Sequence, residues 1–579
     1  MFSVDEMISQ HLPALSQKIS GIENSPKILK TLKTVLRYLL HEKEFIQFEK
    51  DYPNLKGIDF VEQVLDYFNF TYSISDNDHE KIPDTGRVVI IANHPIGSLD
   101  GLALLQLVGR IRPDVKIVAN QLLTQIKPLH NLLFPVDNMG AETRRNQIEN
   151  ITDHLCNEGA IIIFPAGEVS RLSVKGISDK PWNSGFLRLA NKTRAPILPI
   201  HVKARNSLTF YGTSMLFKTL STVMLVGEMF KHEKNEIKVT VGNPIPHNSY
   251  DCKNLPTKTK VGLFKKHVYK MPSGKSYFKT EAPIAHAENR IYLKKEIEEC
   301  ELLGETPDNK KIYLYDHKES TSIMREIGRL REISFRAVGE GSGMKRDIDQ
   351  YDSHYHHLIL WDQDDLEIVG AYRFADTKRV IEQNGVEALY VNSLFGYDKP
   401  MKPYLDRGLE MGRSFVQPKY WGKRSLDYLW QGIGAFIAKN PEFRYLFGPV
   451  SISDSFPPAA RDILVWYYSH YYPHGNKAVN AKKPFRLTPD ALNYASEIFC
   501  GDNAKEDFKR LKHSLDNLGV AVPTLYKQYS ELCEEGGVTF IEFNVDPDFN
   551  NCLDGLVLVD IAKLKPNKRK RYIESHLKQ

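Results

Sequence analysis

The stretch IIANHPIGSLDG, residues 90–101, decides how the first half of this chain folds. It begins in a run of apolar, mostly β-branched residues and then places a histidine, a proline, a glycine and an aspartate in succession. Such an apolar run is typical of a buried strand, and proline and glycine favour a turn at its end. His94 is therefore expected where a strand of an open α/β sheet ends, which is where such folds bind ligands.

Short apolar runs separated by helical stretches continue from this point to about residue 245. The expected strands are 87–92, 115–119, 160–164, 196–202 and 236–242. Near-continuous apolar strands divided by helices predict a parallel sheet that is covered on both faces. We therefore expect an α/β domain.

The second half of the chain shows a different order of elements. The expected strands are 311–316, 356–362, 367–375, 409–417, 445–453, 537–545 and 555–561, with helices at 322–335 and from Ser425. This order is typical of a mostly antiparallel α+β domain. The predicted organisation is a helical N-terminal region (1–80), the α/β domain (81–275), a linker (276–300) and the α+β domain (301–579). The boundary is indicated by the residues from about 246 to 300, which are rich in Lys, Pro, Ser and Gly.

Composition excludes several classes of protein. The 579 residues are 42% hydrophobic and 26% charged, which is typical of a globular chain, and the formal net charge of +5 is too small to indicate a nucleic-acid binder. The six cysteines form no CxxC pair, which favours reduced thiols in the cytoplasm and argues against a metal site. No window is long and apolar enough for a membrane span, and the N-terminus has no signal-peptide pattern.

A basic amphipathic helix is expected from Ser25, in SPKILKTLKTVLRYLL (25–40). Its apolar residues lie on one side, and lysines and an arginine lie on the other. This pattern is typical of a helix that rests on anionic lipid headgroups, and it is equally compatible with a helix that packs on the protein core.

His94 and Asp100 have residue types suited to acyl transfer. Residues six apart on a regular helix point about 120° away from each other, so the two side chains can meet only if a turn intervenes. Pro95 and Gly97 favour such a turn. The aspartate would then orient the imidazole, which takes a proton from a hydroxyl. The alternative is that both residues only cap a helix.

Three blocks, NHPIGSLDG (93–101), FPAGEVSR (164–171) and APILPI (195–200), together resemble the glycerophospholipid acyltransferase family. The resemblance implies that His94 is the general base, that Asp100 is its partner, and that Glu168 and Arg171 bind the acceptor. Two departures are evident: the spacing from His94 to Asp100 is one residue longer than the common pattern, and Ala166 replaces a glutamate. An acceptor with a carboxylate in place of a phosphate would suit Arg171.

Arginines and carboxylates also occur within apolar strands of the second half. Charged groups in such strands are costly unless they are paired, so an interior ion-pair network is one explanation. The order of these residues resembles the GNAT-superfamily N-acyltransferases, especially the acylhomoserine lactone synthases and the enzymes that make lyso-ornithine lipid. The matching positions are Arg331 with Phe335, Asp349 with Asp352, Arg373, and Glu410 with Arg413.

The resemblance implies N-acylation in the second domain. Glu410, or Asp352, would position the amine or accept its proton, and Arg331, Asp349, Arg373 and Arg413 would bind substrate. Lys423 and Arg424, in the loop before the helix at Ser425, would bind the anionic part of an acyl thioester, although the superfamily's usual RxxGxG loop is absent.

The two domains together resemble the bifunctional ornithine lipid synthases. This resemblance predicts an acyltransferase that joins a 3-hydroxyacyl chain to the amine of an amino acid and then esterifies the new hydroxyl. The expected donor is acyl carrier protein or coenzyme A thioester, with no bound cofactor or metal, and the expected partners are acyl carrier protein and the inner face of the cell membrane, to which the protein would attach peripherally. The acceptor could also be glycine, lysine or glutamine. The alternatives are a lysophospholipid acyltransferase with a degenerate second domain, and a membrane-lytic protein without transfer chemistry.

Overall fold

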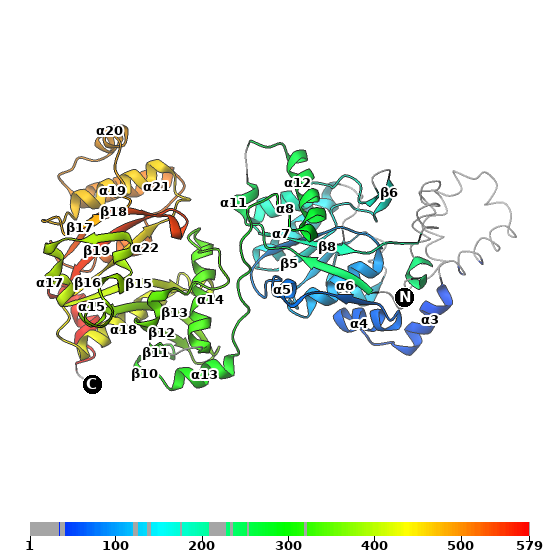
Figure 1. Ribbon diagram of the computed structural model, residues 1–579, viewed down its shortest axis with the longest axis horizontal. Coiled ribbons are helices and arrows are strands. Elements are labelled where there is room, and N and C mark those ends of the chain that lie inside the picture. The colour runs from blue at the N-terminus through cyan, green and yellow to red at the C-terminus, as the bar shows by residue number, and fades with distance from the viewer. Residues whose placement is uncertain are drawn as a thin grey trace. The chain divides into compact units, whose positions relative to one another are not determined.

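The computed structural model in Figure 1 describes residues 34, 37, 41–119, 126–135, 141–173, 176–207, 227–231, 236–251, 254–317 and 321–577. The chain divides into two compact units, Met1–His286 and Ala287–Gln579. The division falls inside the segment expected to be a linker, and helix α13 (Arg290–Glu298) occupies the last part of that segment.

The first unit is built on one seven-stranded sheet. Its strands are β1 (Thr71–Ser73), β2 (Val88–Ala92), β3 (Lys116–Ala119), β4 (Leu133–Pro135), β5 (Ala160–Ile163), β8 (Ile197–Lys203) and β9 (Glu236–Val241), in the order β1-β9-β8-β2-β5-β3-β4. All neighbours are parallel except β8 and β9, which run antiparallel. The sheet is therefore not wholly parallel as expected. Strand β9 alternates buried and less buried residues, as an antiparallel strand with one solvated face does, whereas β2 and β5 are buried throughout.

Helices cover both faces of this sheet. Helices α3 (Glu42–Asp51), α4 (Gly57–Tyr67) and α6 (Ser98–Gly109) contribute to the apolar core on one face, and α7 (Ala141–Cys156), α8 (Gly185–Thr193) and α12 (Thr257–Lys270) contribute to the core on the other. Alternate residues of β2 point to opposite faces, since Val88 and Ile90 lie in the first core and Val89 and Ile91 in the second. The expected α/β fold is confirmed.

The basic helix expected from Ser25 falls almost wholly outside the described residues, which include only Thr34 and Arg37 of it. In the part of the chain that the structure describes, no helix combines the length and the apolarity that a membrane crossing requires. The basic C-terminal segment forms the short helices α23 (Pro566–Arg569) and η10 (Lys570–Glu574), and η10 buries Tyr572 and Ile573.

The second unit is built on an eight-stranded sheet. Its strands are β10 (Glu301–Glu305), β11 (Lys310–Asp316), β12 (His356–Asp362), β13 (Glu367–Asp376), β15 (Gly408–Val416), β16 (Tyr445–Ile452), β18 (Val538–Asp546) and β19 (Cys552–Asp560), in the order β10-β11-β12-β13-β15-β16-β19-β18. Among these neighbours only β15 and β16 run parallel. The expected, mostly antiparallel α+β fold is confirmed.

The two faces of the second sheet carry different elements. Helix α18 (Ser425–Lys439) and helix α19 (Pro458–Tyr471) pack into one large apolar core, and helix α14 (Ser322–Ala337) packs on the opposite face. The charged residues singled out in the sequence gather beside α14.

Candidate active sites in the two units

The turn between β2 and α6 brings His94 and Asp100 together. Gly97 has a backbone φ of 116° and ψ of −114°, which a residue with a side chain rarely adopts. The Asp100 carboxylate accepts the main-chain N–H groups of Ile96 (3.0 Å) and Gly97 (3.1 Å) and so closes the turn. His94 Nδ1 lies 3.1 Å from Asp100 Oδ1, although the angles are not those of a hydrogen bond.

The imidazole of His94 is partly accessible, and its surroundings favour the protonated form. The side chain is 19% exposed, and its ring stacks on Phe164 with 4.0 Å between centroids. Burial acts to lower the pKa of His94, but the charges of Asp100 and Asp179 outweigh it and raise the pKa above its ordinary value. The group is therefore suited to accept a proton near neutral pH.

The second block, FPAGEVSR, lies directly beside His94. Strand β5 pairs with β2, and the main-chain N–H of Ser170 donates to the carbonyl of His94 at 2.7 Å. Arg171 Nη2 lies 3.0 Å from Glu168 Oε2, and Lys180 Nζ pairs with the other carboxylate oxygen. Burial acts to raise the pKa of Glu168, but these two cations outweigh it and lower the pKa. One carboxylate therefore shares two positive charges.

Asp179 was missed by the sequence reasoning. It is 3% exposed, and its carboxylate accepts hydrogen bonds from Ser170 Oγ (2.5 Å), Trp182 Nε1 (2.8 Å) and the main-chain N–H of His94 (3.4 Å). No spacing rule relates an aspartate 85 positions away to His94. The only signal was an acidic residue three positions before a tryptophan in the segment after the second block.

In the second unit, five of the predicted residues form one largely buried chain of alternating charges. Arg331 lies 2.8 Å from Asp352, Asp352 lies 3.0 Å from Arg373, and Arg373 lies 2.5 Å from Asp349. Arg413 then pairs with Asp349 (3.3 Å) and with Asp347 (3.1 Å), which the sequence reasoning did not include. The interior ion-pair network that the charge pattern allowed is therefore present, and its three arginines are balanced by three aspartates.

Arg413 reaches this network because β15 is irregular. Its backbone φ is 48°, in the left-handed region, and the pairing of β13 with β15 shifts between Ala371 and Arg373. Such a bulge places two residues of one strand opposite one of the other and redirects a side chain. The guanidinium then stacks over the rings of Tyr390 (4.8 Å) and Phe549 (4.6 Å).

Glu410 lies next to this network, with no arginine or lysine within ion-pair distance in the described part of the chain. It is 1% exposed, and its Oε1 accepts hydrogen bonds from Tyr355 Oη (2.9 Å) and the main-chain N–H of Val391 (3.0 Å). Its Oε2 is buried and has no hydrogen-bond partner. Burial raises the pKa of Glu410 to about 7. A carboxylate with one unused oxygen and this pKa is suited to exchange a proton with an amine.

The parallel strands β15 and β16 part directly after Glu410. Their paired residues end at Glu410 and Phe447, although β15 continues to Val416 and β16 to Ile452. At the far end of β15, Lys423 lies over the ring of Tyr420 (4.9 Å), and Arg424, 62% exposed, immediately precedes α18. The structure thus puts these two cations at a helix N-terminus, but does not join them to the buried charge network.

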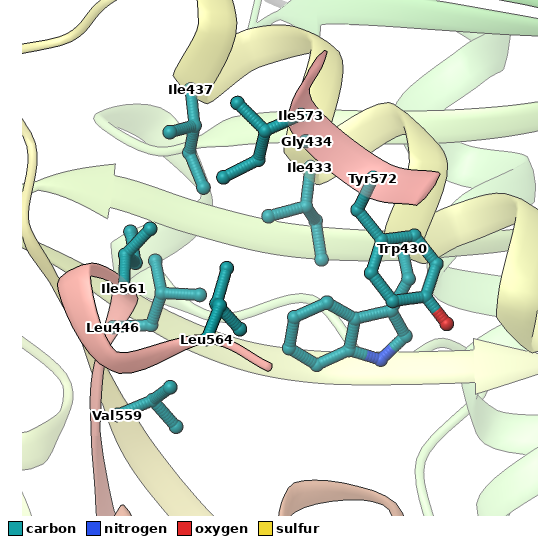
Figure 2. Close-up of a pocket in the computed structure, with 10 residues that line it drawn as sticks. All are labelled: Trp430, Ile433, Gly434, Ile437, Leu446, Val559, Ile561, Leu564, Tyr572 and Ile573. Carbon is teal, nitrogen blue, oxygen red and sulfur yellow. The ribbon is translucent and has the colours of Figure 1, made fainter. Parts of the chain in front are cut away.

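The apolar cavity drawn in Figure 2 is separate from these groups. It is lined by α18, β16, β19 and the C-terminal segment, including Trp430, Leu446 and Tyr572. These residues belong to the core on the α18 face, whereas Glu410 lies on the α14 face. The only unpartnered buried polar atom among its lining residues is Trp430 Nε1.

Comparison with known proteins identifies both units. Residues 16–273 match the family described as Acyltransferase, and residues 330–431 match the Acetyltransferase (GNAT) domain family. The chain is 31% identical over 300 residues to the glycine N(alpha)-acyltransferase of Phocaeicola vulgatus, an alignment that covers 50% of this chain and 91% of the relative.

Two further relatives complete the comparison. The lyso-glycine lipid O-acyltransferase of Phocaeicola vulgatus is 29% identical over 243 residues, which is 41% of this chain and 86% of the relative. The L-ornithine N(alpha)-acyltransferase of Rhodobacter capsulatus is 28% identical over 262 residues, which is 43% of this chain and 90% of the relative. The chain therefore belongs to the acyltransferase family of these relatives, as an enzyme in which an acyltransferase domain precedes a GNAT domain.

Proposed function

We propose that this chain makes a two-chain aminolipid by two consecutive acylations. The second unit would join a 3-hydroxyacyl chain to the α-amine of an amino acid, and the first unit would then esterify the new hydroxyl. The observation that carries the proposal is the presence of two differently built proton-accepting sites, His94 with Asp100 and Glu410 with Tyr355, in one chain. The relatives support it, because their names include both an N-acyltransferase and a lyso-lipid O-acyltransferase.

In the first unit, the imidazole of His94 is the general base. It takes the proton of the lyso-lipid hydroxyl while the oxygen attacks the thioester carbonyl. The C–S bond then breaks, and the departing thiolate takes the proton back from the imidazolium. Asp100 stabilises the imidazolium and holds the turn that presents it.

The charge of the acceptor stretch supports an aminolipid over a lysophospholipid. Glu168, Arg171 and Lys180 together carry one net positive charge, because the carboxylate neutralises one of the two cations. One positive charge matches the single carboxylate of an acylated amino acid better than a phosphate monoester, which carries up to about two negative charges at neutral pH.

In the second unit, the amine nitrogen attacks the thioester carbonyl while Glu410 takes a proton from it through the unpartnered Oε2. The C–S bond breaks as the amide forms, and the departing thiolate takes the proton back from Glu410. The ion-pair network fixes the positions of the side chains beside Glu410, and its arginines offer N–H donors for the carboxylate of the amino acid. The network consists of Arg331, Asp349, Asp352, Arg373 and Arg413.

Ornithine is the first candidate acceptor. Glu340, Asp546 and Asp554 are each buried, and none forms an ion pair with a lysine or arginine in the described residues. Burial raises the pKa of Asp554 well above its ordinary value, and a second ammonium group on the acceptor would offset this cost. Glycine, which has no such group, is the second candidate because the names of four relatives specify it.

The donor and the location follow from charge. Lys423 and Arg424 precede the N-terminus of α18 and suit an anionic thioester donor such as acyl carrier protein, or alternatively coenzyme A. The basic amphipathic sequence pattern of residues 25–40 and the C-terminal segment KLKPNKRKR (563–571) favour peripheral attachment to the inner face of the membrane, close to the lipid product.

Expression in a bacterial host without aminolipids, followed by mass spectrometry of lipid extracts, tests the proposal. The intact chain should yield a phosphorus-free two-chain aminolipid whose headgroup is ornithine or glycine. His94→Ala should leave the single-chain aminolipid to accumulate, and Glu410→Gln should abolish both products. A two-chain product that persists in His94→Ala, a new phospholipid, or lysis without any new lipid would each contradict the assignment.

A further inference from the structure

His94 is held through its main chain as well as its side chain. Its carbonyl accepts the Ser170 N–H, and its own N–H points to Asp179 Oδ1, to which the Ser170 hydroxyl also donates. Ser170 and Asp179 therefore bracket the peptide groups on both sides of His94. Ser170 lies between Glu168 and Arg171, so the proposed base and the proposed acceptor stretch share this attachment.

Asp179 is itself anchored from several segments. Trp182 Nε1 donates to Oδ2, the Asp179 main-chain N–H donates to Tyr269 Oη at 2.9 Å, and Lys265 Nζ donates to the Asp179 carbonyl. All donors to its carboxylate are uncharged groups. In the described residues, no side-chain cation is in direct contact with this buried carboxylate to offset its charge.

The charged and titratable groups around this pair are few. Asp100 faces the imidazole from α6, and Phe164 covers the ring from the other side. His201 on β8 and Tyr269 on α12 lie near Asp179, and their rings contact each other at 5.7 Å. An effect of Asp179 on His94 must therefore be separated from the effects of Asp100 and His201.

We propose that Asp179 is a positioning residue for acyl transfer, which fixes the main chain of His94 while Asp100 faces the imidazole. The negative charge of Asp179 also favours the imidazolium that forms during the reaction. This inference rests on the proposed role of His94 as general base, but it concerns a contact that can be measured without any substrate.

The test uses the full-length protein and diethyl pyrocarbonate, which modifies neutral imidazole. The rate of modification of His94, followed by peptide mass spectrometry from pH 5 to pH 9, gives the midpoint of its titration. Asp179→Asn should lower this midpoint by about one pH unit, because one of two nearby negative charges is lost. In Asp179→Asn an N–H group of the asparagine amide would face the N–H of Trp182, and two donors repel each other. The double variant D179N/W182F removes the Trp182 donor and should show the same shift.

Charge-conserving variants are the matched controls. Tyr269→Phe loosens the attachment of Asp179 and His201→Gln removes the neighbouring histidine, and both should leave the midpoint unchanged. Trp182→Phe keeps the carboxylate but removes one donor to it, so the midpoint should rise by a few tenths of a unit.

An unchanged midpoint in folded Asp179→Asn would overturn the proposal. If neither asparagine variant folds, Trp182→Phe decides alone: a higher midpoint supports the proposal, and an equal or lower one contradicts it. Failure of the proposed general-base role would look different. His94→Ala would then still esterify the lyso-lipid, although Asp179→Asn still shifted the midpoint.

Discussion

Tyr355→Phe tests how the second unit sets the proton affinity of Glu410. The Tyr355 hydroxyl donates to Glu410 Oε1 at 2.9 Å inside a buried site. A hydrogen bond to a charged group contributes about 1.5 to 3 kcal/mol, and one pKa unit corresponds to about 1.4 kcal/mol. Loss of this donor should therefore raise the pKa of Glu410, which burial already places at about 7, by about one to two units.

The assay is the pH dependence of thiol release from a 3-hydroxyacyl thioester with amino acid present. In the proposed mechanism the carboxylate form of Glu410 is the active one, so N-acylation by the native enzyme should rise with pH through about 7. In Tyr355→Phe the rising part of this pH profile should move to higher pH. The phenyl ring that remains lies beneath Arg373, whose guanidinium is 5.0 Å from the ring centre. The ionisation of the amine itself affects all variants equally.

Tyr397→Phe is the matched control. The Tyr397 hydroxyl is also buried near Glu410 but makes no hydrogen bond, so its removal should not change the pH at which N-acylation rises. Equal midpoints for the native enzyme and Tyr355→Phe, with both folded, would refute the assigned role of the hydroxyl. An equal shift in Tyr397→Phe would show that general loosening of the site was responsible.

Three further predictions follow from the same contacts. Glu410→Gln should stabilise the second unit at pH 8.5 but not at pH 4, as measured by thermal melting. The pKa of Glu410 is raised to about 7 in the folded protein, so the stability that its protonated form contributes is present below the ordinary pKa and is lost as pH rises through 7. The difference is about 3 kcal/mol. Gly97→Ala should destabilise the turn by about 1 to 3 kcal/mol and reduce esterification of supplied lyso-lipid, while N-acylation stays unchanged; equal loss of both activities would count against separate sites. Arg331→Met should destabilise the second unit by about 3 to 5 kcal/mol in denaturant titrations, because it removes one of the cations that balance the charge of buried Asp352. A native-like denaturation midpoint would mean that the network contributes little to stability.

The sequence predicted the elements better than it predicted their pairing. Runs of apolar, often β-branched residues predicted five of the seven strands of the first sheet, but not the three-residue strands β1 and β4. Strands β2 and β5 are indeed buried on both faces. The direction of β9 was not predicted, because strand direction depends on the connection and not on the apolar pattern. The alternation of buried and less buried residues in β9 was the available signal.

The candidate sites show the same limit. The turn residues Pro95 and Gly97 predicted that His94 and Asp100 meet, because a local turn can be deduced from a few adjacent residues. Asp179 could not be found, since its approach to His94 depends on the packing of segments far apart in the chain. The position of Arg413 likewise depends on a bulge, and strand periodicity alone would have placed its side chain on the other face.

The bulge in β15 bears on how this enzyme can vary in evolution. The two ends of the strand pair with β13 in registers that differ by one residue, so Glu410 and Arg413 face the same side although they are three positions apart. Deletion of Gly412 would remove the bulge and keep the two side chains on one face, two positions apart. Deletion of Ser414 would instead leave a regular strand in which the guanidinium points toward the apolar core beneath α18. Homologues should therefore tolerate the loss of a residue before Arg413 better than the loss of one after it.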